Sequence, residues 1–346
     1  MLRFHHLKNK MYKDKVKLET LKKIRDENFA IFRAVATYLN EFPRLVTNKI
    51  MEEIVGDVSG IEESSFALFL STALSENDTE AKHFEREYFK KSVKLLSVEE
   101  YKNNPYFKNI KIPNKKVSTW ELGYQSYEPY EGFIYDDIDV FDNYREIPKI
   151  GFFKERFSFP TVFEDGVEWM AIKPNEIETM KPHIEKMSGD VVVFGLGIGY
   201  FTYMVSQKAD VTSITVVERD SSVIRLFEKY ILPQFENKDK IKIVKSDAFI
   251  YAQKQMTNEK FDCAFVDLWH DVSDGVELYI KMKKLEAKSP STKFYYWIEK
   301  SILSNIRWHI FDGIEKQIEN RKFTEPYESI VKYISDDYLK NFVKFL

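Results

Sequence analysis

Hydrophobic and charged positions alternate with a helical period over the first hundred residues. In the stretch 15–42 the apolar positions are mostly three or four residues apart, at Leu18, Leu21, Phe29, Phe32, Ala36 and Leu39. This spacing predicts an amphipathic helix. Shorter helices are expected to begin near Thr47 and Ser97 and to cover 62–75 and 78–95. Residues 1–105 are therefore expected to form a helical N-terminal domain.

The helical period is lost between residues 106 and 172. Prolines and tyrosines gather in this segment, together with the acidic residues 136, 137, 139 and 142. Two short strands are then expected, over 157–163 and 168–172, because Asp165-Gly166 between them is a hairpin turn signal. The pattern predicts an irregular linker that ends in a small β-hairpin.

From residue 173 onward, short apolar runs alternate with helical patterns. The expected strands are 191–194, 213–217, 241–244, 263–266 and 293–298, and the expected helices between them begin at about 175, 200, 221, 248 and 273. Apolar, β-branched strands in strict alternation with helices indicate a parallel sheet that is covered on both faces. Residues 173–346 are thus expected to form an α/β, doubly wound, Rossmann-like domain whose last 45 residues are mainly helical.

The composition argues against several classes of protein: nucleic-acid or membrane binders, disulfide-stabilised proteins and metal-binding proteins. The chain has 346 residues, 44% hydrophobic and 31% charged, which is the balance of a globular protein. A net charge of -3 gives no basic field for nucleic acid or an anionic membrane. One cysteine excludes an intramolecular disulfide, and six scattered histidines show no metal spacing. No signal peptide or membrane span is expected, so we expect a cytoplasmic protein.

Glycine is scarce, yet three of the twelve glycines lie within five positions, Gly195, Gly197 and Gly199. They occur where an expected strand turns into a helix, so the backbone can turn sharply and free N–H groups can hold an anionic ligand group. Glu218 follows 21 positions after Gly197, at the end of the next strand. An acid there can accept hydrogen bonds from both hydroxyls of a ribose. Dinucleotide and S-adenosylmethionine (SAM) sites share this arrangement.

Two details favour SAM over a dinucleotide. The spacing is Gly-x-Gly-x-Gly, and Tyr200 occupies the position of the third glycine of a dinucleotide loop. Asp247 closes the third strand and is followed by Ala248, so its carboxylate can accept a hydrogen bond from an adenine amino group. Asp247 can equally cap the helix that follows.

The motifs GLGIGYF, VVERD, KSDAF and FDCAFVDLWHD occur in this order over about residues 155–300. In order and spacing they resemble the class I SAM-dependent methyltransferases, and most closely the spermidine synthase-like branch. The resemblance implies a methyltransferase fold with a small β lead-in, and SAM or decarboxylated SAM as the cofactor. Polyamine synthases, however, carry Gly-Gly-Gly-Asp-Gly in the loop and two aspartates three apart after the fourth strand. Here the loop has no aspartate, and Asp267 and Asp271 are four apart.

The candidate catalytic residues follow the fourth expected strand. Asp267 ends this strand at the edge where open α/β sheets bind ligands. His270 is a candidate general base, and a solvent-exposed or capping role is its alternative. Asp271 is expected either to bind substrate or to cap the next helix, and Trp269 either to cover the substrate or to fill the core. Glu176 lies in the stretch that resembles the substrate-facing lead-in helix of the branch, and its alternative is a helix N-terminal acid.

Three functions fit these features. The first is a SAM-dependent methyltransferase acting on a small molecule. The second is an aminopropyltransferase that uses decarboxylated SAM, with an acidic pocket around Asp267, Asp271 and Glu176. The third is a SAM- or nucleoside-binding module with a protein partner and no turnover. No nucleic acid or membrane partner is expected. The methyl acceptor, a homodimer, the role of residues 1–150 and the presence of the C-terminal antiparallel strand pair usual in methyltransferases are left open.

Overall fold

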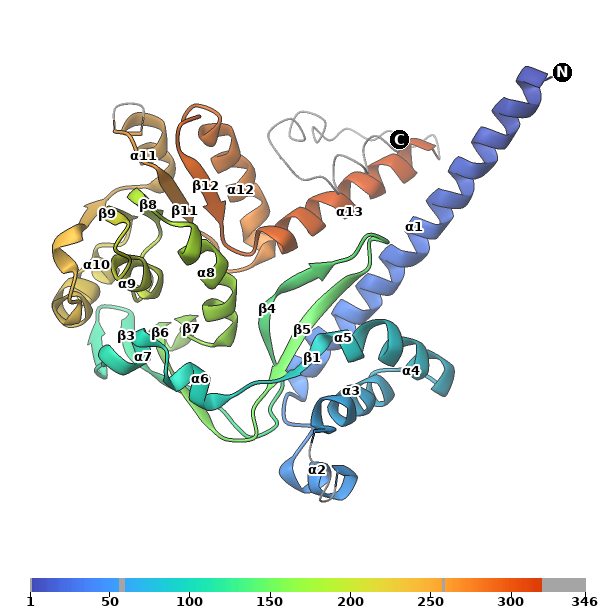
Figure 1. The fold of residues 1–346 in the computed structure, drawn as a ribbon, viewed down its shortest axis with the longest axis horizontal. Coiled ribbons are helices and arrows are strands. Elements are labelled where there is room, and N and C mark those ends of the chain that lie inside the picture. Colours follow the sequence, from blue (N-terminus) through green and yellow to red (C-terminus); the bar gives the residue numbers. More distant parts are fainter. Residues whose placement is uncertain (1, 56–59, 257–258, 319–346) are drawn as a thin grey trace. The chain divides into compact units, whose positions relative to one another are not determined.

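The structure, a computed structural model, describes residues 2–55, 60–256 and 259–318 (Figure 1). The chain forms two compact units. The first unit comprises residues 1–96, 128–134 and 138–155, and the second comprises 97–127, 135–137 and 156–346. The segment 106–172, expected as a linker and hairpin, is therefore divided between the two units. No helix within the described ranges is long and apolar enough to cross a membrane.

The first unit packs helices against a small sheet. Its helices are α1 (Leu2–Glu41), α2 (Asn48–Val55), α3 (Glu62–Ala73), α4 (Asp78–Phe84) and α5 (Lys90–Ser92), with a π-helical turn over Glu85–Phe89. Its strands are β1 (Val93–Leu95), β4 (Phe133–Val140) and β5 (Glu146–Phe152), in the order β1-β5-β4. Phe66 of α3 stacks on Phe152 of β5 at 4.3 Å between ring centroids, and both side chains are fully buried. The expected helices thus enclose one core with strands that the sequence pattern did not predict.

A five-stranded sheet dominates the second unit. Its strands are β8 (Gly189–Phe194), β9 (Val211–Glu218), β10 (Ile241–Lys245), β11 (Cys263–Val266) and β12 (Lys293–Tyr296). All neighbours pair in parallel, in the order β10-β9-β8-β11-β12. Residues 191–194 of the central strand are buried on both faces, which explains its uninterrupted apolar sequence. The five strands predicted from the sequence are confirmed, with β12 ending two residues earlier.

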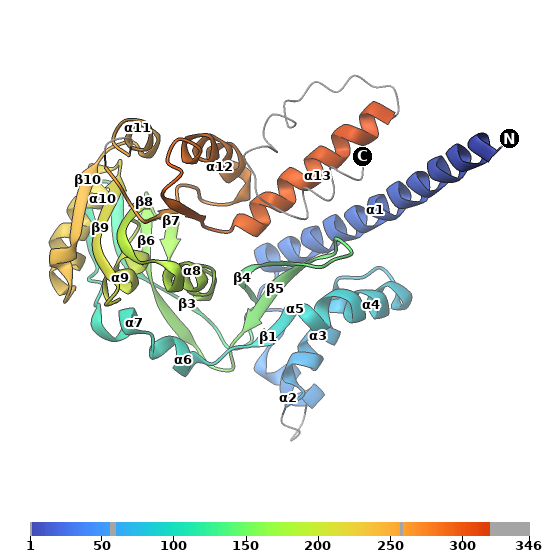
Figure 2. The same ribbon diagram turned by 45° about the horizontal axis from the view of Figure 1, so that its top comes forward.

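The helices of this sheet complete the doubly wound fold (Figure 2). They are α8 (Pro174–Lys186), α9 (Tyr200–Ser206), α10 (Ser221–Leu226), α11 (Ala248–Lys254), α12 (Val272–Glu286) and α13 (Glu299–Ile318). The chain builds β8, β9 and β10 in one direction and then returns to add β11 and β12 on the other side of β8. Right-handed crossovers therefore place the helices of the two halves on opposite faces. The question of a C-terminal antiparallel strand pair falls on residues 319–346, outside the described residues.

A four-stranded antiparallel sheet also belongs to the second unit. Its strands are β2 (Lys115–Val117), β3 (Trp120–Tyr127), β6 (Phe157–Glu164) and β7 (Val167–Ala171), in the order β2-β3-β6-β7. The hairpin predicted over 157–172 is confirmed as β6 and β7, joined by Asp165 (φ 50°) and Gly166 (φ 82°). The sheet is larger than expected because β3 pairs with β6 over its full eight residues.

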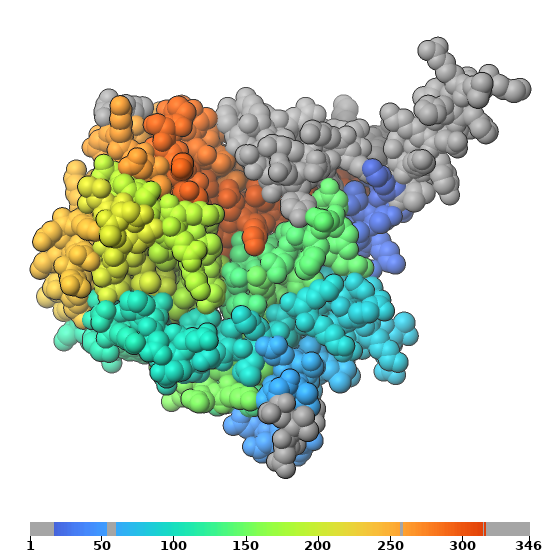
Figure 3. All heavy atoms as spheres, viewed as in Figure 1, coloured from blue at the N-terminus to red at the C-terminus, as the bar shows by residue number. Residues whose placement is uncertain are grey.

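Two short helices precede this sheet in the chain, α6 (Val98–Lys102) and α7 (Pro105–Asn109). The hydroxyl oxygen of Ser97 accepts the N–H of Glu100 at 3.4 Å and caps α6, which confirms the helix start predicted near Ser97. Both helices belong to the second unit, although the sequence pattern assigned α6 to the N-terminal helical region and left most of α7 in the segment expected to be irregular. Figures 1 and 3 show this segment, in teal, lying against the yellow-green α8–α9 region.

Candidate functional site

A cavity of about 430 Å³ opens at the carboxyl ends of the parallel strands of the second unit. Its walls include the glycine loop after β8, residues 217–220 after β9, 246–249 after β10 and 267–270 after β11. The hairpin of β6 and β7, the start of α8, and residues of β3, α10 and α12 also line it. The four motifs found in the sequence therefore meet at one place, which is where open α/β sheets bind ligands.

The glycine loop needs glycine for conformation and for packing. Gly195 has φ 101°, and a Cβ there would collide with the backbone carbonyl of Asp267. Gly199 has φ 75° and begins α9, beneath the ring of Phe227. Gly195 and Gly197 line the cavity, and Gly199 lies behind it. Side chains at these positions would collide with their neighbours or occupy the cavity. Two of the three glycines, Gly195 and Gly197, line the cavity itself.

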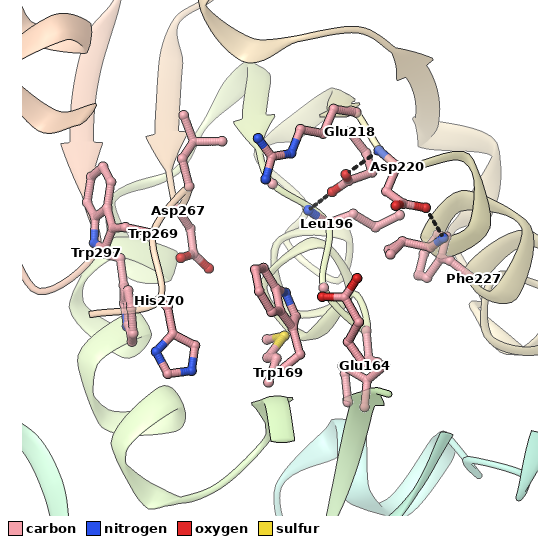
Figure 4. A pocket seen from close by; sticks show the side chains of 18 of the residues that line it. Glu164, Trp169, Leu196, Glu218, Asp220, Phe227, Asp267, Trp269, His270 and Trp297 are labelled. Carbon is pink, nitrogen blue, oxygen red and sulfur yellow. Dashed lines mark hydrogen bonds between the residues drawn. The ribbon is translucent and has the colours of Figure 1, made fainter. Parts of the chain in front are cut away.

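Glu218 presents its carboxylate to the cavity in a fixed orientation. Its Oε2 accepts the N–H of Leu196 at 3.2 Å, and its Oε1 accepts the N–H of Asp220 at 2.8 Å (Figure 4). Burial raises the pKa of this half-buried carboxyl, and the two backbone donors oppose that rise. Each oxygen keeps a lone pair toward the cavity, which suits the two hydroxyls of a ribose.

Asp247 and Ala248 both line the cavity. The Oδ1 atom of Asp247 accepts the N–H of Ile250 at 2.9 Å, so this side chain does cap α11. None of the described residues donates a hydrogen bond to its other oxygen. The capping role therefore leaves one carboxylate oxygen for a ligand amino group.

Glu176 and Asp267 place two carboxyl groups in the cavity wall, one buried and one half-buried. Glu176 lies in the first turn of α8, with 7% of its surface exposed, and Asp267 is half-buried at the end of β11. Burial raises the pKa of Glu176, and the charge of Asp267 raises it further. Burial also raises the pKa of Asp267, with a contribution from Glu218. No described residue donates a hydrogen bond to either carboxyl group, so both can receive a donor from a ligand.

His270 lines the rim of the cavity, and about half of its side chain is exposed. Its ring centroid lies 6.0 Å from that of Trp169, and its backbone N–H donates to Asp274 at 3.1 Å. Trp269, for which both a covering and a core role were open, is buried and lines the same cavity. His270 therefore lies at the entrance of the cavity, and Trp269 lies in its buried part.

Asp271 lies outside the cavity lining, unlike Asp267 and His270. Its Oδ1 accepts the N–H of Ser273 at 2.6 Å, and with Asp274 it forms a capping box at the start of α12. The hydrogen bond from Ser273 lowers the pKa of Asp271, so it stays ionised as a cap. The structure gives this residue the second of its two expected roles, and it is Asp274 that reaches the cavity wall.

Residues 104–106, which belong to no sequence motif, form hydrogen bonds to the glycine loop and to the start of α9. The hydroxyl of Tyr106 donates to the carbonyl of Ile198 at 2.6 Å, and Tyr106 is fully buried. Nδ2 of Asn104 donates to the hydroxyl of Tyr200 at 3.0 Å. Sequence reasoning missed this support because isolated Asn and Tyr residues carry no spacing signal. Glu176, in contrast, was signalled by its place in the lead-in helix.

Within the described part of the chain, no group of three or more His, Cys, Asp or Glu side chains is arranged to hold a metal ion. The donor set of the cavity instead consists of carboxylates, backbone N–H groups and aromatic rings. These groups suit an organic ligand that carries hydroxyl and amino donors.

The sheet order, the glycine loop after β8 and the acid after β9 define a class I SAM-dependent methyltransferase-like fold. Residues 175–284 match the family model described as the spermine/spermidine synthase domain. This part of the chain therefore has a spermidine synthase-like fold, as the resemblance of its motifs implied. No curated protein matches the chain.

Solved structures of similar proteins include spermidine synthases and a methyltransferase. The spermidine synthase from Thermotoga maritima is 18% identical, with 41% of this chain and 53% of that chain covered and a TM-score of 0.30. A spermidine synthase in complex with the transition state analogue AdoDATO is 19% identical, with 41% and 54% covered and a TM-score of 0.32. A putative O-methyltransferase from Klebsiella pneumoniae is 14% identical, with 31% and 48% covered and a TM-score of 0.25. The chain thus spans about half the length of these proteins.

Proposed function

We propose that this chain is a SAM-dependent methyltransferase whose acceptor is the nitrogen of a small amine. The observation that carries the proposal is the Glu176–Asp267 pair, a buried and a half-buried carboxyl group that line the cavity and receive no hydrogen bond from the described residues. The family match supports the coarser class, a transferase that uses a SAM-related cofactor. An amine is the acceptor that such a pair can bind and deprotonate.

The residues of the cavity fit a nucleoside cofactor. Glu218 would hold the ribose hydroxyls, Asp247 and Ala248 the adenine edge, and Gly195 and Gly197 would let the ligand approach the main chain. When bound, SAM supplies a methyl group that already carries its sulfonium leaving group. The protein therefore has to position the acceptor nitrogen in line and to exclude water.

The carboxyl pair supplies the proton chemistry. An ammonium ion has no lone pair and must lose a proton before its nitrogen can attack a methyl carbon. The raised pKa of Asp267 makes this carboxylate a base near neutral pH, and Glu176 shares the proton. His270 at the rim can pass the proton to solvent.

Aminopropyl transfer from decarboxylated SAM is the second candidate. The family match and the acidic cavity favour it, because a polyamine is a cation. The glycine loop has no aspartate, however, and Asp271 lies outside the cavity. Two of the acidic positions that polyamine synthases carry are thus missing from the cavity. We therefore favour methyl transfer over aminopropyl transfer.

Calorimetric titration tests the proposal. We expect the full chain to bind SAM and S-adenosylhomocysteine, and Glu218→Ala to lose this binding. The matched control is Glu228→Ala, which removes an exposed acid of the same β9–β10 connection outside the cavity. Methyl transfer from labelled SAM to a panel of amines would complete the case. A preference for methylthioadenosine over S-adenosylhomocysteine would favour aminopropyl transfer instead.

Binding without transfer to any acceptor would favour the third function, a binding module with a protein partner. The cavity extends past the glycine loop to the tryptophans and His270, which argues for a second ligand beside the cofactor. A cytoplasmic location and a homodimer stay predictions.

A further inference from the structure

Four of the five tryptophans of the chain line this one cavity, Trp120, Trp169, Trp269 and Trp297. They come from β3, from β7 and from the residues that follow β11 and β12. Trp120 and Trp169 meet edge to face at 5.6 Å, and 44% of Trp169 is exposed at the mouth. Trp269 and Trp297 are buried, with 5% and 7% exposed. Tryptophans from four separate strands thus converge on the ligand space.

The inner tryptophans are held rigidly. Nε1 of Trp297 donates to the hydroxyl of Thr179 at 2.9 Å, and its backbone N–H donates to Val266 at 3.0 Å. Ile298 follows with φ 44°, a left-handed conformation that β-branched residues rarely adopt. Such strain persists where the surrounding structure requires it, and here it lies in the turn that carries Trp297. Trp269 stacks on Tyr296 at 6.4 Å and an interplanar angle of 11°.

The carboxyl groups that line the cavity differ in whether described residues already bind them, and this difference indicates where a buried cation would bind. Glu218, Asp220 and Asp247 accept backbone hydrogen bonds at element ends. Glu168 pairs with Lys173 at 2.6 Å, and Asp274 accepts the N–H of His270. Of the lining carboxyl groups, Glu176, Asp267 and Glu164 receive no hydrogen bond from described residues, and Glu164 is at the mouth beside Trp169 (Figure 4). The deep part of the cavity therefore offers one carboxyl pair and aromatic faces around it.

We propose that the acceptor is a monoamine with a compact apolar body, such as an arylalkylamine. The inference rests on the proposed function and names the substrate class of the same site. The nitrogen would lie at Glu176 and Asp267, and the tryptophan faces would cover the hydrocarbon, since aromatic faces bind both apolar groups and organic cations. A linear diamine would need a second carboxylate at the other end, and Glu164 is the one lining carboxylate open to it.

The experiment compares two probes on the full chain saturated with S-adenosylhomocysteine. Calorimetry measures the Kd of phenethylamine and of 1,4-diaminobutane for the unaltered protein, Trp169→Ala, Trp169→Phe, Glu164→Gln and Glu176→Gln. The control is Val167→Ala, an exposed residue of the same strand that does not line the cavity. We expect phenethylamine to bind at least about tenfold more tightly than the diamine, and Trp169→Ala to weaken it about tenfold. Trp169→Phe should restore most of this affinity, and Glu164→Gln and Val167→Ala should leave it unchanged.

Equal or tighter binding of the diamine overturns the inference, as does a loss with Glu164→Gln that matches the loss with Glu176→Gln. An equal effect of Trp169→Ala on both probes overturns it too. If S-adenosylhomocysteine binds and phenethylamine does not, the inference fails alone and the proposed function stands. If S-adenosylhomocysteine itself does not bind, the proposed function fails and the inference fails with it.

Discussion

At the scale of single residues, Glu176 and Asp267 bring two carboxyl groups into the cavity wall, and none of the described residues donates a hydrogen bond to either of them. Burying a carboxylate costs free energy unless a donor or cation compensates it. The protein avoids part of this cost by holding a proton, which is why burial raises the pKa of both groups. A site of this kind is stable when protonated and becomes strained as it ionises, until a cationic ligand arrives.

The first prediction concerns stability against pH in the absence of ligand. Because the folded pKa of Glu176 lies above its ordinary value of 4.5, the folded state binds more protons than the unfolded state between the two values. Stability is therefore full below the ordinary value and falls as the pH rises through the raised one. Urea denaturation over a pH series should show this decline, and Glu176→Gln should flatten it. An unchanged slope in Glu176→Gln would contradict the assignment.

The second prediction concerns Gly195. Replacing it with alanine combines a disfavoured φ with a collision against the carbonyl of Asp267. Gly166→Ala is the matched control, because Gly166 also has a positive φ but open space around it. Denaturation should show a loss of about 1 kcal/mol for Gly166→Ala and a clearly larger loss for Gly195→Ala. Only the second variant should lose S-adenosylhomocysteine, and equal losses of stability would show that the collision is relieved by a small shift.

At the scale of elements, the short helix α7, with its N-cap residue Asn104, acts as a support for the glycine loop. Three side-chain hydrogen bonds join this segment to the loop and α9, through Asn104, Tyr106 and Asn109. The segment lies outside residues 175–284, which the family model matches. The candidate site therefore depends on a part of the chain that the four sequence motifs do not include.

The third prediction tests this support. Tyr106→Phe removes the hydroxyl that donates to Ile198 and leaves a buried carbonyl without its donor, at a cost of about 1 to 3 kcal/mol. We expect a weaker Kd for S-adenosylhomocysteine as well. Tyr101→Phe is the control, since Tyr101 donates to Glu178 of α8 at 3.0 Å and does not touch the loop. If both variants lower stability but neither changes the Kd, the support is structural alone.

The elements differ in how far the sequence predicted them. The parallel strands β8 to β12 were predictable because they are buried on both faces, and the β6–β7 hairpin because Asp165-Gly166 marks its turn. The strands β3, β4 and β5 were not, because polar residues interrupt their apolar pattern and because β3 and β5 pair with the remote strands β6 and β1. In the site, the spacing of Gly195, Glu218 and Asp247 was enough to predict that these residues lie together, and they line one cavity. The positions of Trp120, Trp169 and Trp297 in the cavity were not predictable, because only Trp269 of the four lies in a sequence motif.

At the scale of the whole molecule, the family match covers less of the chain than the second compact unit does. The match spans residues 175–284, and the unit begins at residue 97. The β6–β7 hairpin pairs with β3, whose residues Trp120–Tyr127 precede the match by some fifty positions. The buried contacts of α7 with the glycine loop come from still earlier in the chain. The matched segment alone therefore lacks strands and supports that its cavity needs.

The fourth prediction follows. A fragment of residues 156–346 contains the whole family match but lacks β3, α6 and α7, so we expect it to aggregate or to bind no S-adenosylhomocysteine. A fragment of residues 97–346 restores these elements and should regain binding, with the full chain as the reference. Circular dichroism and calorimetry measure both properties. Full binding by fragment 156–346 would show that β3 and the short helices are dispensable.

The order of segments in the two units has a consequence for how such a chain can change over generations. The sequence passes from one unit to the other five times between residues 96 and 156. A single recombination breakpoint anywhere in that stretch would divide at least one unit, and at residue 96 it would part β1 from its sheet partner β5. Neither unit can then be exchanged by one crossover, and the gene segment that encodes them is expected to be inherited whole.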